Sequence, residues 1–442
     1  MTRAGAAGEG IGLEHASRRS GTEAWRLAVL AAFAFLVLIP VTLPVPVLRE
    51  LVKDRFGVSE LATSLFMSIN MVGAFLAAPL AGAIGDRFGH RPLLIGGALL
   101  VDGLCFLLLT GDLPFPAFLA VRFVEGCAHI FALSLLLGLA AAARPPEGRG
   151  TAMGAVGGGL LLGVAVGAPL GGVLGAGDPL RPLRVGAALV GGTALLVPLL
   201  LREPVGLRGH RPGWSEIAAL LARHRRVVVP LAFAFADRFT VGFFTSTFPL
   251  FLRGVHELHP TQIGGLIASF MVPFAVLSAP FGILSQKTSP AALLCGGSLI
   301  YGLLVASLGF WPGQLLLGPM VAAGVAAAVM FVPSLLLTAE LTPETVRTTS
   351  LGAFNAAGSL GFIVGPLTGG LVSETVAAEA GWLAGYRAAF LVAGGAEIAL
   401  ALAAWPVLRR VAARRHRPSD AAPAGPAERR CAAGEGRKGG RR

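Results

Sequence analysis

Long apolar runs alternate with short polar stretches along the whole chain. Cutting the sequence at charged residues and at clusters of proline, glycine and aspartate leaves twelve apolar runs: 27–48, 61–84, 92–110, 116–142, 151–174, 185–201, 227–252, 263–284, 291–311, 315–339, 351–372 and 382–408. A bilayer core about 30 Å thick is crossed by roughly 20 apolar residues in a helix. Each run is therefore predicted to be a transmembrane helix, which makes the protein all-α.

The composition supports a lipid bilayer as the surroundings of most of the chain. Of the 442 residues, 54% are hydrophobic and 14% are charged, and the mean hydropathy is +0.73. A soluble chain of this length would need more charge on its surface. The first run, 27–48, is too long for the core of a signal peptide and no small-residue cleavage site follows it. It is predicted to be a membrane span.

The basic residues predict the orientation of the chain in the membrane. With the N-terminus inside, 27 of the 36 lysines and arginines are cytoplasmic, 6 lie in outer loops and 3 lie within spans. Cytoplasmic loops carry the basic excess, so both termini are predicted to be cytoplasmic. The net charge of +12 then reflects orientation and attraction to anionic lipids, and no nucleic-acid partner is expected. Arginine outnumbers lysine 33 to 3, which favours a bacterial inner membrane.

The two parts of the chain repeat each other. The stretches 149–172 and 347–370 are identical at ten of 24 positions at an offset of 198 residues, and they open spans 5 and 11. An even number of spans between the copies makes the repeat parallel. The predicted organisation is a cytoplasmic segment 1–24, a six-helix half 25–201, a linker 202–226, a second six-helix half 227–408 and a basic disordered tail 409–442. A short helix around Trp214 is expected either to lie on the inner leaflet or to be only a polar connector.

Several function classes find no support in the sequence. The four cysteines lack the spacing of disulfides or metal sites, and no cofactor or metal is expected. No Gly-x-x-x-x-Gly-Lys-[Ser/Thr] loop is present, which disfavours an ATP-driven pump. No constellation of side chains suggests an enzyme. A monomer that binds a small molecule and protons is expected.

A charged turn follows the second span, in the stretch GAIGDRFGHRP at 82–92. Gly82 allows close approach of another helix. Asp86 lies at a helix end, where a helix N-terminus or an arginine can meet its charge. Gly89 permits a tight turn, and Arg87 and Arg91 supply positive charge.

This stretch resembles the signature Gly-x-x-x-Asp-Arg-x-Gly-Arg-Arg/Lys between helices 2 and 3 of the major facilitator superfamily. His90 stands where a basic residue is usual, and the second-half loop at 282–290 has Gln286 in place of the aspartate. The resemblance covers 25–408 and implies the major facilitator fold, two pseudo-symmetric halves of six helices. It also implies that the loop clasps the cytoplasmic ends of the halves together in the outward-facing state.

Three further stretches resemble the twelve-span drug and metabolite exporters of that family. Residues 122–126 resemble the Arg-x-x-x-Gly signature associated with proton transfer. Residues 163–172 resemble the antiporter signature Gly-x-x-x-Gly-Pro-x-x-Gly-Gly, with Ala168 at the usual proline position and Pro169 after it. Pro40, Pro44 and Pro46 match the span-1 pattern and are expected to bend or open that helix. The glycines can equally form a packing face, whose candidate residues are Gly163, Gly167, Pro169, Gly171, Gly361, Gly365, Pro366 and Gly369.

Few ionisable residues lie within the spans, and each is a candidate functional residue because buried charge in a membrane costs about 2.5–3.5 kcal/mol on insertion scales. On span 4, Arg122, Glu125 and His129 share one helical stripe. In the resembled fold spans 1, 4, 7 and 10 line the central cavity, so these side chains are expected to face it. The alternatives are a self-neutralising Arg122–Glu125 pair and a packing role for His129. Asp102 and Glu397, on the peripheral spans 3 and 12, are expected to be packing-side or protonated carboxyls, and no function is assigned to them.

Asp237 and Arg238 lie side by side in the apolar span 7. Neighbours on a helix point about 100° apart, so one can face the cavity while the other contacts a neighbouring helix. A carboxylate there is suited to coupling proton uptake to substrate release. The alternative is a structural pair that holds span 7 against its neighbour, and whether Asp237 or Glu125 carries the proton stays open.

The sequence therefore predicts a proton-coupled secondary exporter of small amphiphilic molecules. An importer or uniporter on the same fold is the first alternative, because symport and antiport use the same machinery. A non-transporting membrane sensor or a lipid-handling protein is an alternative of another class.

Overall fold

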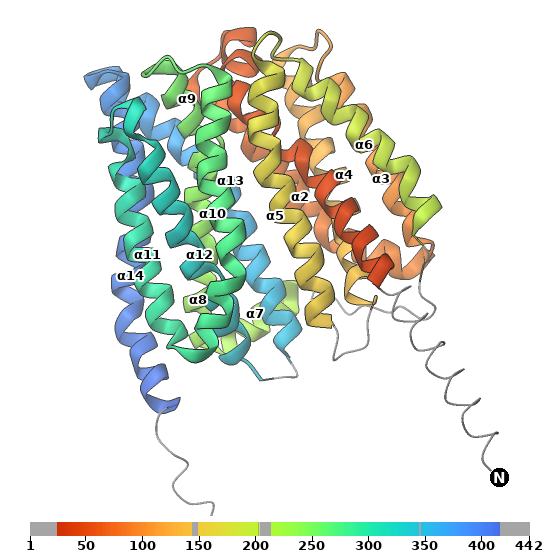
Figure 1. Ribbon diagram of the computed structural model, residues 1–442, viewed down its shortest axis with the longest axis vertical. Helices are drawn as coiled ribbons and strands as arrows, with labels where there is room; N and C mark the ends of the chain where they lie inside the picture. The colour runs from red at the N-terminus through yellow and green to blue at the C-terminus, as the bar shows by residue number, and fades with distance from the viewer. Residues whose placement is uncertain (1–23, 144–148, 202, 204–213, 344–345, 416–442) are drawn as a thin grey trace, which may run out of the picture.

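The computed structural model describes 24–143, 149–201, 203, 214–343 and 346–415, and every long element in these ranges is a helix (Figure 1). The first span is Ala24–Val47. The α-helices that follow are α2 Glu60–Phe88, α3 Arg91–Leu108, α4 Phe115–Ala141, α5 Arg149–Gly175, α6 Arg181–Leu200, α7 Trp214–Arg223, α8 Val228–Thr245, α9 Thr247–Gly254, α10 Pro260–Lys287, α11 Pro290–Ser307, α12 Leu317–Glu340, α13 Arg347–Ala380 and α14 Trp382–Arg415.

Twelve spans long and apolar enough to cross a membrane are found in the described part of the chain, which confirms the predicted number. Each predicted run falls on one of them. The seventh is built from α8 and α9, which are separated at Ser246. The predicted disordered tail and the N-terminal segment lie outside the described residues, apart from Ala24 and the end of α14.

The first span of each half is interrupted near the same end of the molecule. In span 1 the helix stops before Pro44, and a 3-10 turn at Val45–Val47 and a π-helix at Arg49–Asp54 follow. A proline removes one backbone donor and clashes with the preceding turn. The expectation that the prolines open this helix is therefore confirmed. In the second half, Ser246 makes the corresponding break.

The repeated glycines pack the helices of each half backbone to backbone. A Cβ on Gly163, Gly167 or Gly171 would lie 2.4, 2.3 or 2.0 Å from the carbonyl oxygen of Phe35, Ile39 or Leu43 on span 1. In the second half, a Cβ on Gly361 or Gly365 would lie 2.3 Å from the carbonyl oxygen of Phe235 or Phe239 on α8. The sequence repeat is thus a repeat of one helix contact, α5 on span 1 and α13 on α8.

The glycine pair that ends each repeat touches both halves. Gly171 packs on span 1, whereas a Cβ on Gly172 would lie 2.4 Å from the carbonyl oxygen of Pro260 on α10. In α13, Gly369 packs on its own half, whereas Gly370 lies against Leu61 and Ser64 of α2. One glycine of each pair therefore packs its half together and the other brings the two halves into contact.

Polar contacts join the halves at this end of the molecule, which we call the closed end. Glu60, 2% exposed, accepts a hydrogen bond from the Tyr386 hydroxyl at 2.9 Å and pairs with Lys53. Further contacts between the halves are Arg253 Nε to Glu50 at 2.6 Å, Ser246 Oγ to Ser64 Oγ at 2.7 Å, the Leu61 amide to Glu374 at 2.9 Å and Lys53 Nζ over the Trp382 ring at 4.6 Å.

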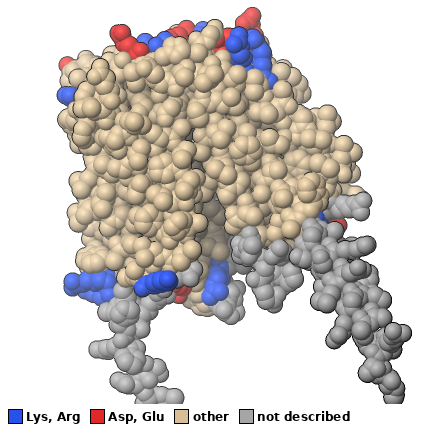
Figure 2. All heavy atoms as spheres, viewed as in Figure 1, with Lys and Arg blue, Asp and Glu red and all other residues tan. Residues whose placement is uncertain are grey.

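At the opposite end, which carries α7, the two halves draw apart and leave a hollow between them (Figure 2). We call this the open end. The helix α7 forms where the sequence predicts a short helix. Its apolar face packs on the protein, because Ile217, Leu220 and Leu221 join a cluster with Leu231 of α8 and Ala353 of α13. The two six-helix halves are those of the predicted fold, while the exact boundaries at 201 and 227 stay a prediction.

Candidate functional site

The charged stripe of α4 forms one tight ion pair. Arg122 Nη1 donates to Glu125 Oε2 at 2.7 Å, and the two side chains are 2% and 3% exposed. The Asn70 side chain on α2 also donates to Glu125 Oε2, and the Arg122 guanidinium lies 4.6 Å from the centre of the Phe66 ring. Because a Cβ on Gly126 would lie 2.0 Å from the Asn70 carbonyl oxygen, α2 and α4 approach closely enough for these contacts.

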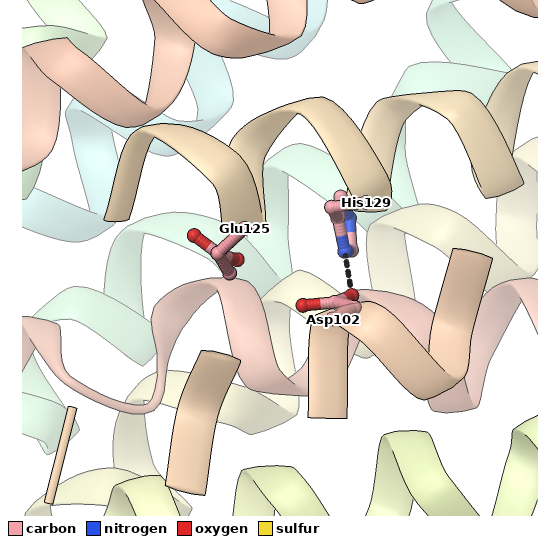
Figure 3. A group of neighbouring side chains, drawn as sticks. All are labelled: Asp102, Glu125 and His129. Carbon is pink, nitrogen blue, oxygen red and sulfur yellow. Dashed lines mark hydrogen bonds and ion pairs between the residues drawn. The ribbon is translucent and has the colours of Figure 1, made fainter. Parts of the chain in front are cut away.

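His129 makes a second polar contact, with a partner that the sequence did not assign. Its Nδ1 lies 3.0 Å from Asp102 Oδ2 on α3, and the two residues are 9% and 0% exposed. Figure 3 shows the imidazole of α4 pointing at the carboxylate of α3, with Glu125 one turn away on α4. Asp102, expected to be a packing-side or protonated carboxyl, is buried and has His129 as its partner.

The α4 side chains face the neighbouring helices of their own half. Arg122, Glu125 and His129 were expected to face the central cavity, yet their partners lie on α2 and α3 and all three are buried. A charge in the membrane interior is stabilised by a hydrogen-bonded partner of opposite charge. The partners on α2 and α3 supply that stabilisation here, which explains the difference.

Asp102, Glu125 and His129 also have the composition of a metal site. One ligand atom of each lies within 4.8 Å of the others. However, Glu125 already accepts hydrogen bonds from Arg122 and Asn70. The permanent charge of Arg122 opposes a second cation at this place. The arrangement is better suited to an acid–base function than to a metal ion.

Asp237 and Arg238 of α8 lie apart from this cluster and are more accessible. Arg238 Nη1 is 3.8 Å from Asp237 Oδ2, and the side chains are 17% and 18% exposed in that order. The Arg238 guanidinium lies 5.4 Å from the centre of the Phe354 ring on α13. A Cβ on Gly358 would lie 2.3 Å from Arg238 Cδ, so this glycine makes room for the arginine. Arg238 therefore contacts a neighbouring helix, as one of the two was expected to.

The remaining buried acid, Glu397 on α14, accepts a hydrogen bond from Ser298 on α11 and is 0% exposed. Nearby, the Tyr301 hydroxyl of α11 lies 3.1 Å from Thr240 Oγ1 of α8. These contacts join α11 to α14 and α8 through single hydrogen bonds, without an ion pair.

The charged turn 82–92 is described in part. Gly89 has a φ of 61°, which confirms its role in the turn, and His90 follows at a φ of 52°. Arg91 contacts Glu203, with its amide 3.1 Å from the carboxylate and Nε 3.7 Å from it. Gly82 is buried and Arg87 is exposed, while the side chain of Asp86 lies outside the described residues. The described contact joins the turn to the beginning of the predicted linker.

Sequence reasoning missed the polar groups that link the helices. Asn70 interrupts an apolar run in the middle of span 2, and this isolated amide was a usable signal. Glu60 and Tyr386 belong to different halves and are 326 residues apart, and nothing in a single sequence pairs them.

Comparisons with known proteins agree with the fold. The family model described as Major Facilitator Superfamily matches residues 30–258 and 231–436. The 3-(3-hydroxy-phenyl)propionate transporter of Escherichia coli (strain K12) is 27% identical over 355 residues, covering 78% of this chain and 85% of that protein. The multidrug resistance protein MdtG of Salmonella choleraesuis (strain SC-B67) is 27% identical over 405 residues, covering 89% and 96%.

Solved structures share the architecture at lower identity. A bacterial homolog of the human lysosomal transporter Spinster, inward-facing and unoccupied, has a TM-score of 0.74 at 18% identity over 88% of this chain and 97% of that one. The D-xylose–proton symporter has a TM-score of 0.70 at 16% identity over 86% and 97%. These likenesses support the all-α fold of two six-helix halves.

Proposed function

The chain belongs to the major facilitator superfamily, and from that premise we propose that it is a proton-coupled exporter of small amphiphilic molecules. It works by alternating access, as a monomer in a bacterial inner membrane with both termini cytoplasmic. The observation that carries the proposal is the buried acid–base cluster on α3 and α4. Ionisable groups inside a membrane are expensive and mark ion or proton pathways.

The direction of transport rests on two supports. The relative MdtG is named a multidrug resistance protein and matches 89% of this chain. The glycine repeat of α5 has the form enriched in antiporters of the resembled family. Both favour movement of the substrate out of the cell.

The closed and open ends correspond to the two faces of the membrane in this proposal. The basic residues predict that the end with α7 is cytoplasmic. The hollow in Figure 2 then opens to the cytoplasm, and the contacts around Glu60 and Tyr386 close the outer face. Substrate enters from the cytoplasm, and those outer contacts must break before it leaves.

The proton and the substrate use different halves in this proposal. Asp237 and Arg238 keep 18% and 17% of their side chains accessible, so they are suited to contact a substrate. Arg122, Glu125 and His129 are buried among charged partners, which suits a proton. Burial thus favours the α4 residues over Asp237 as the place of the coupling proton. The turn 82–92 clasps the halves on the cytoplasmic side when the protein faces outward.

An importer or uniporter of small organic acids is the second candidate. Arg238 Nη1 is buried without a hydrogen bond among the described residues, and a carboxylate is the group that a guanidinium binds best. The relative from Escherichia coli is named a transporter of 3-(3-hydroxy-phenyl)propionate, which has a carboxylate and an aromatic ring.

Uptake of a compound panel into everted vesicles tests the proposal. The panel contains cationic and neutral amphiphiles together with aromatic carboxylates. Export predicts accumulation that stops when the proton gradient is collapsed. Accumulation only in right-side-out vesicles would favour the importer, and no movement of any compound in either orientation would favour a sensor or lipid-handling protein.

A further inference from the structure

The contact between Asp102 and His129 has a property that the Arg122–Glu125 pair lacks. In the neutral imidazole that donates from Nδ1 to Asp102, the lone pair is on Nε2. His129 Nε2 and Asp102 Oδ1 are both buried without a hydrogen-bond partner among the described residues. The lone pair of His129 Nε2 is therefore buried with no hydrogen-bond donor next to it among the described residues.

With Asp102 ionised, the charges of the cluster balance when this nitrogen is protonated. Arg122 neutralises Glu125 at 2.7 Å. His129 is the partner of Asp102, so beside an ionised Asp102 a neutral imidazole leaves one uncompensated negative charge, whereas an imidazolium leaves none. A buried ion pair is tolerated in low dielectric and a lone buried charge is not. One additional positive charge would therefore make the cluster electrically neutral.

Among the residues that the structure describes, no other group beside the pair would supply this charge. Around the pair, the titratable groups that α3 and α4 contribute are Arg122, Glu125 and the thiols of Cys105 and Cys127. From α2 the cluster receives the Asn70 amide and the Phe66 ring. A divalent cation would add two positive charges beside Arg122, one more than Asp102 can balance.

We infer that the Asp102–His129 pair is a single-proton site within the N-terminal half. The occupied form is carboxylate and imidazolium, and the empty form is carboxylate and neutral imidazole. The proton comes from water, binds at Nε2 of His129 and returns to water from the same nitrogen. This deepens the proposed proton coupling, on which its use in transport rests, and it assigns the proton to His129 instead of Glu125 or Asp237.

The helix α2 connects this site to the contact between the halves. Asn70 bonds to Glu125, and two residues earlier Ser68 Oγ donates to the Ile363 carbonyl oxygen of α13 at 2.8 Å. Occupancy that shifts α4 against α2 therefore acts on a helix that also touches the other half. A proton bound at His129 can in this way shift the equilibrium between the inward-facing and the outward-facing state of the transporter.

Infrared difference spectroscopy of the purified protein in proteoliposomes tests the site without substrate. Between pH ~5 and ~8 the wild type should show an imidazole band that is lost in His129→Asn and displaced in Asp102→Asn. His259→Asn is the matched control, because His259 is exposed at the start of α10 and asparagine is a good N-cap. This control should keep the band.

Three results separate the site from the transport function. A band that is unchanged in Asp102→Asn would overturn the inference, as would stoichiometric binding of Mn²⁺ or Zn²⁺ that is lost in both variants. His129→Gln repeats the test if the asparagine variant does not fold. The predicted band together with transport that ignores the proton gradient would support the proton site and overturn the proposed coupling.

Discussion

In the N-terminal half the ionisable side chains within the membrane touch one another, whereas in the C-terminal half they lie apart. Arg122 and Glu125 form an ion pair at 2.7 Å, and His129 contacts Asp102 of the adjacent helix at 3.0 Å. Asp237 and Arg238 approach only to 3.8 Å, and Glu397 has a serine for its partner. The glycine contacts of α5 and α13 nevertheless repeat from one half to the other.

The same helix packing in the two halves therefore carries two different arrangements of ionisable side chains. The glycines of α5 pack on span 1 in the same way as those of α13 pack on α8, so the two halves share this helix contact. The side chains of Arg122 and Glu125 are 2% and 3% exposed, whereas those of Arg238 and Asp237 are 17% and 18% exposed. Together they fit a transporter whose proton and substrate bind in different halves.

The largest effect is expected from Arg122→Ala. It leaves Glu125 charged and unpaired in the interior, a loss worth about 3–5 kcal/mol. Thermal unfolding in detergent should show a large drop in apparent melting temperature. Arg238→Gln breaks a longer and less deeply buried pair and should lower the apparent melting temperature less.

The double variant Arg122→Ala/Glu125→Ala is the control for this comparison. Removing both partners leaves no lone charge, so the double variant should be more stable than Arg122→Ala alone. A double variant as unstable as the sum of the single variants would show that the two side chains act independently.

A strong loss of transport is expected from Asp86→Asn. In the proposed cycle the turn 82–92 holds the cytoplasmic ends together in the outward-facing state, so removing its charge should shift the protein towards the open-end conformation described here. Initial transport rates should fall at unchanged expression and membrane insertion. Lys287→Gln, in the second-half loop that lacks the aspartate, is the matched control. Full transport by Asp86→Asn would contradict a clasp role for this turn.

A moderate change is expected from Gly358→Ala on α13. The added Cβ would lie 2.3 Å from Arg238 Cδ, and the arginine must move away from the Phe354 ring. Apparent substrate affinity should weaken severalfold while the response to the proton gradient persists. Gly395→Ala, where a Cβ meets nothing within 4 Å, is the control. An unaltered affinity in Gly358→Ala would separate Arg238 from substrate binding.

The smallest effect concerns a histidine outside the membrane spans. Burial lowers the pKa of His256, whose ring lies 4.8 Å from that of Phe251. Since the unfolded chain then binds the proton more readily, stability is lost as the pH falls through about 6.5. The apparent melting temperature of His256→Asn should fall less between pH ~7.5 and ~5 than that of the wild type. An equal fall in both would remove His256 as a source of acid sensitivity.

The fold was predictable from the sequence because membrane spans are encoded locally. Runs of apolar residues fix the number of helices, and the glycine repeat fixes the two halves. The prolines of span 1 also predicted the interruption of that helix, since the effect of proline on a helix is local.

The sequence predicted several residues of the candidate site but not the partners that they contact. The sequence identified Arg122, Glu125 and His129 as one stripe. The direction in which the stripe faces depends on the polar partners that α2 and α3 provide. Asp102 was set aside because span 3 is peripheral, yet α3 lies close enough to α4 for the carboxylate to reach His129. Partners on other helices are tertiary information that helical periodicity does not contain.

The central claim is that the N-terminal half holds the proton and the C-terminal half contacts the substrate. It is tested most directly by measuring gradient-driven accumulation and counterflow exchange in the same proteoliposomes, for His129→Asn and Asp237→Asn. We predict that His129→Asn loses accumulation but keeps counterflow, which needs no net proton movement. Asp237→Asn should alter the substrate concentration dependence of both and still accumulate substrate when a proton gradient is imposed. The opposite pattern, with accumulation lost in Asp237→Asn and intact in His129→Asn, would contradict the account.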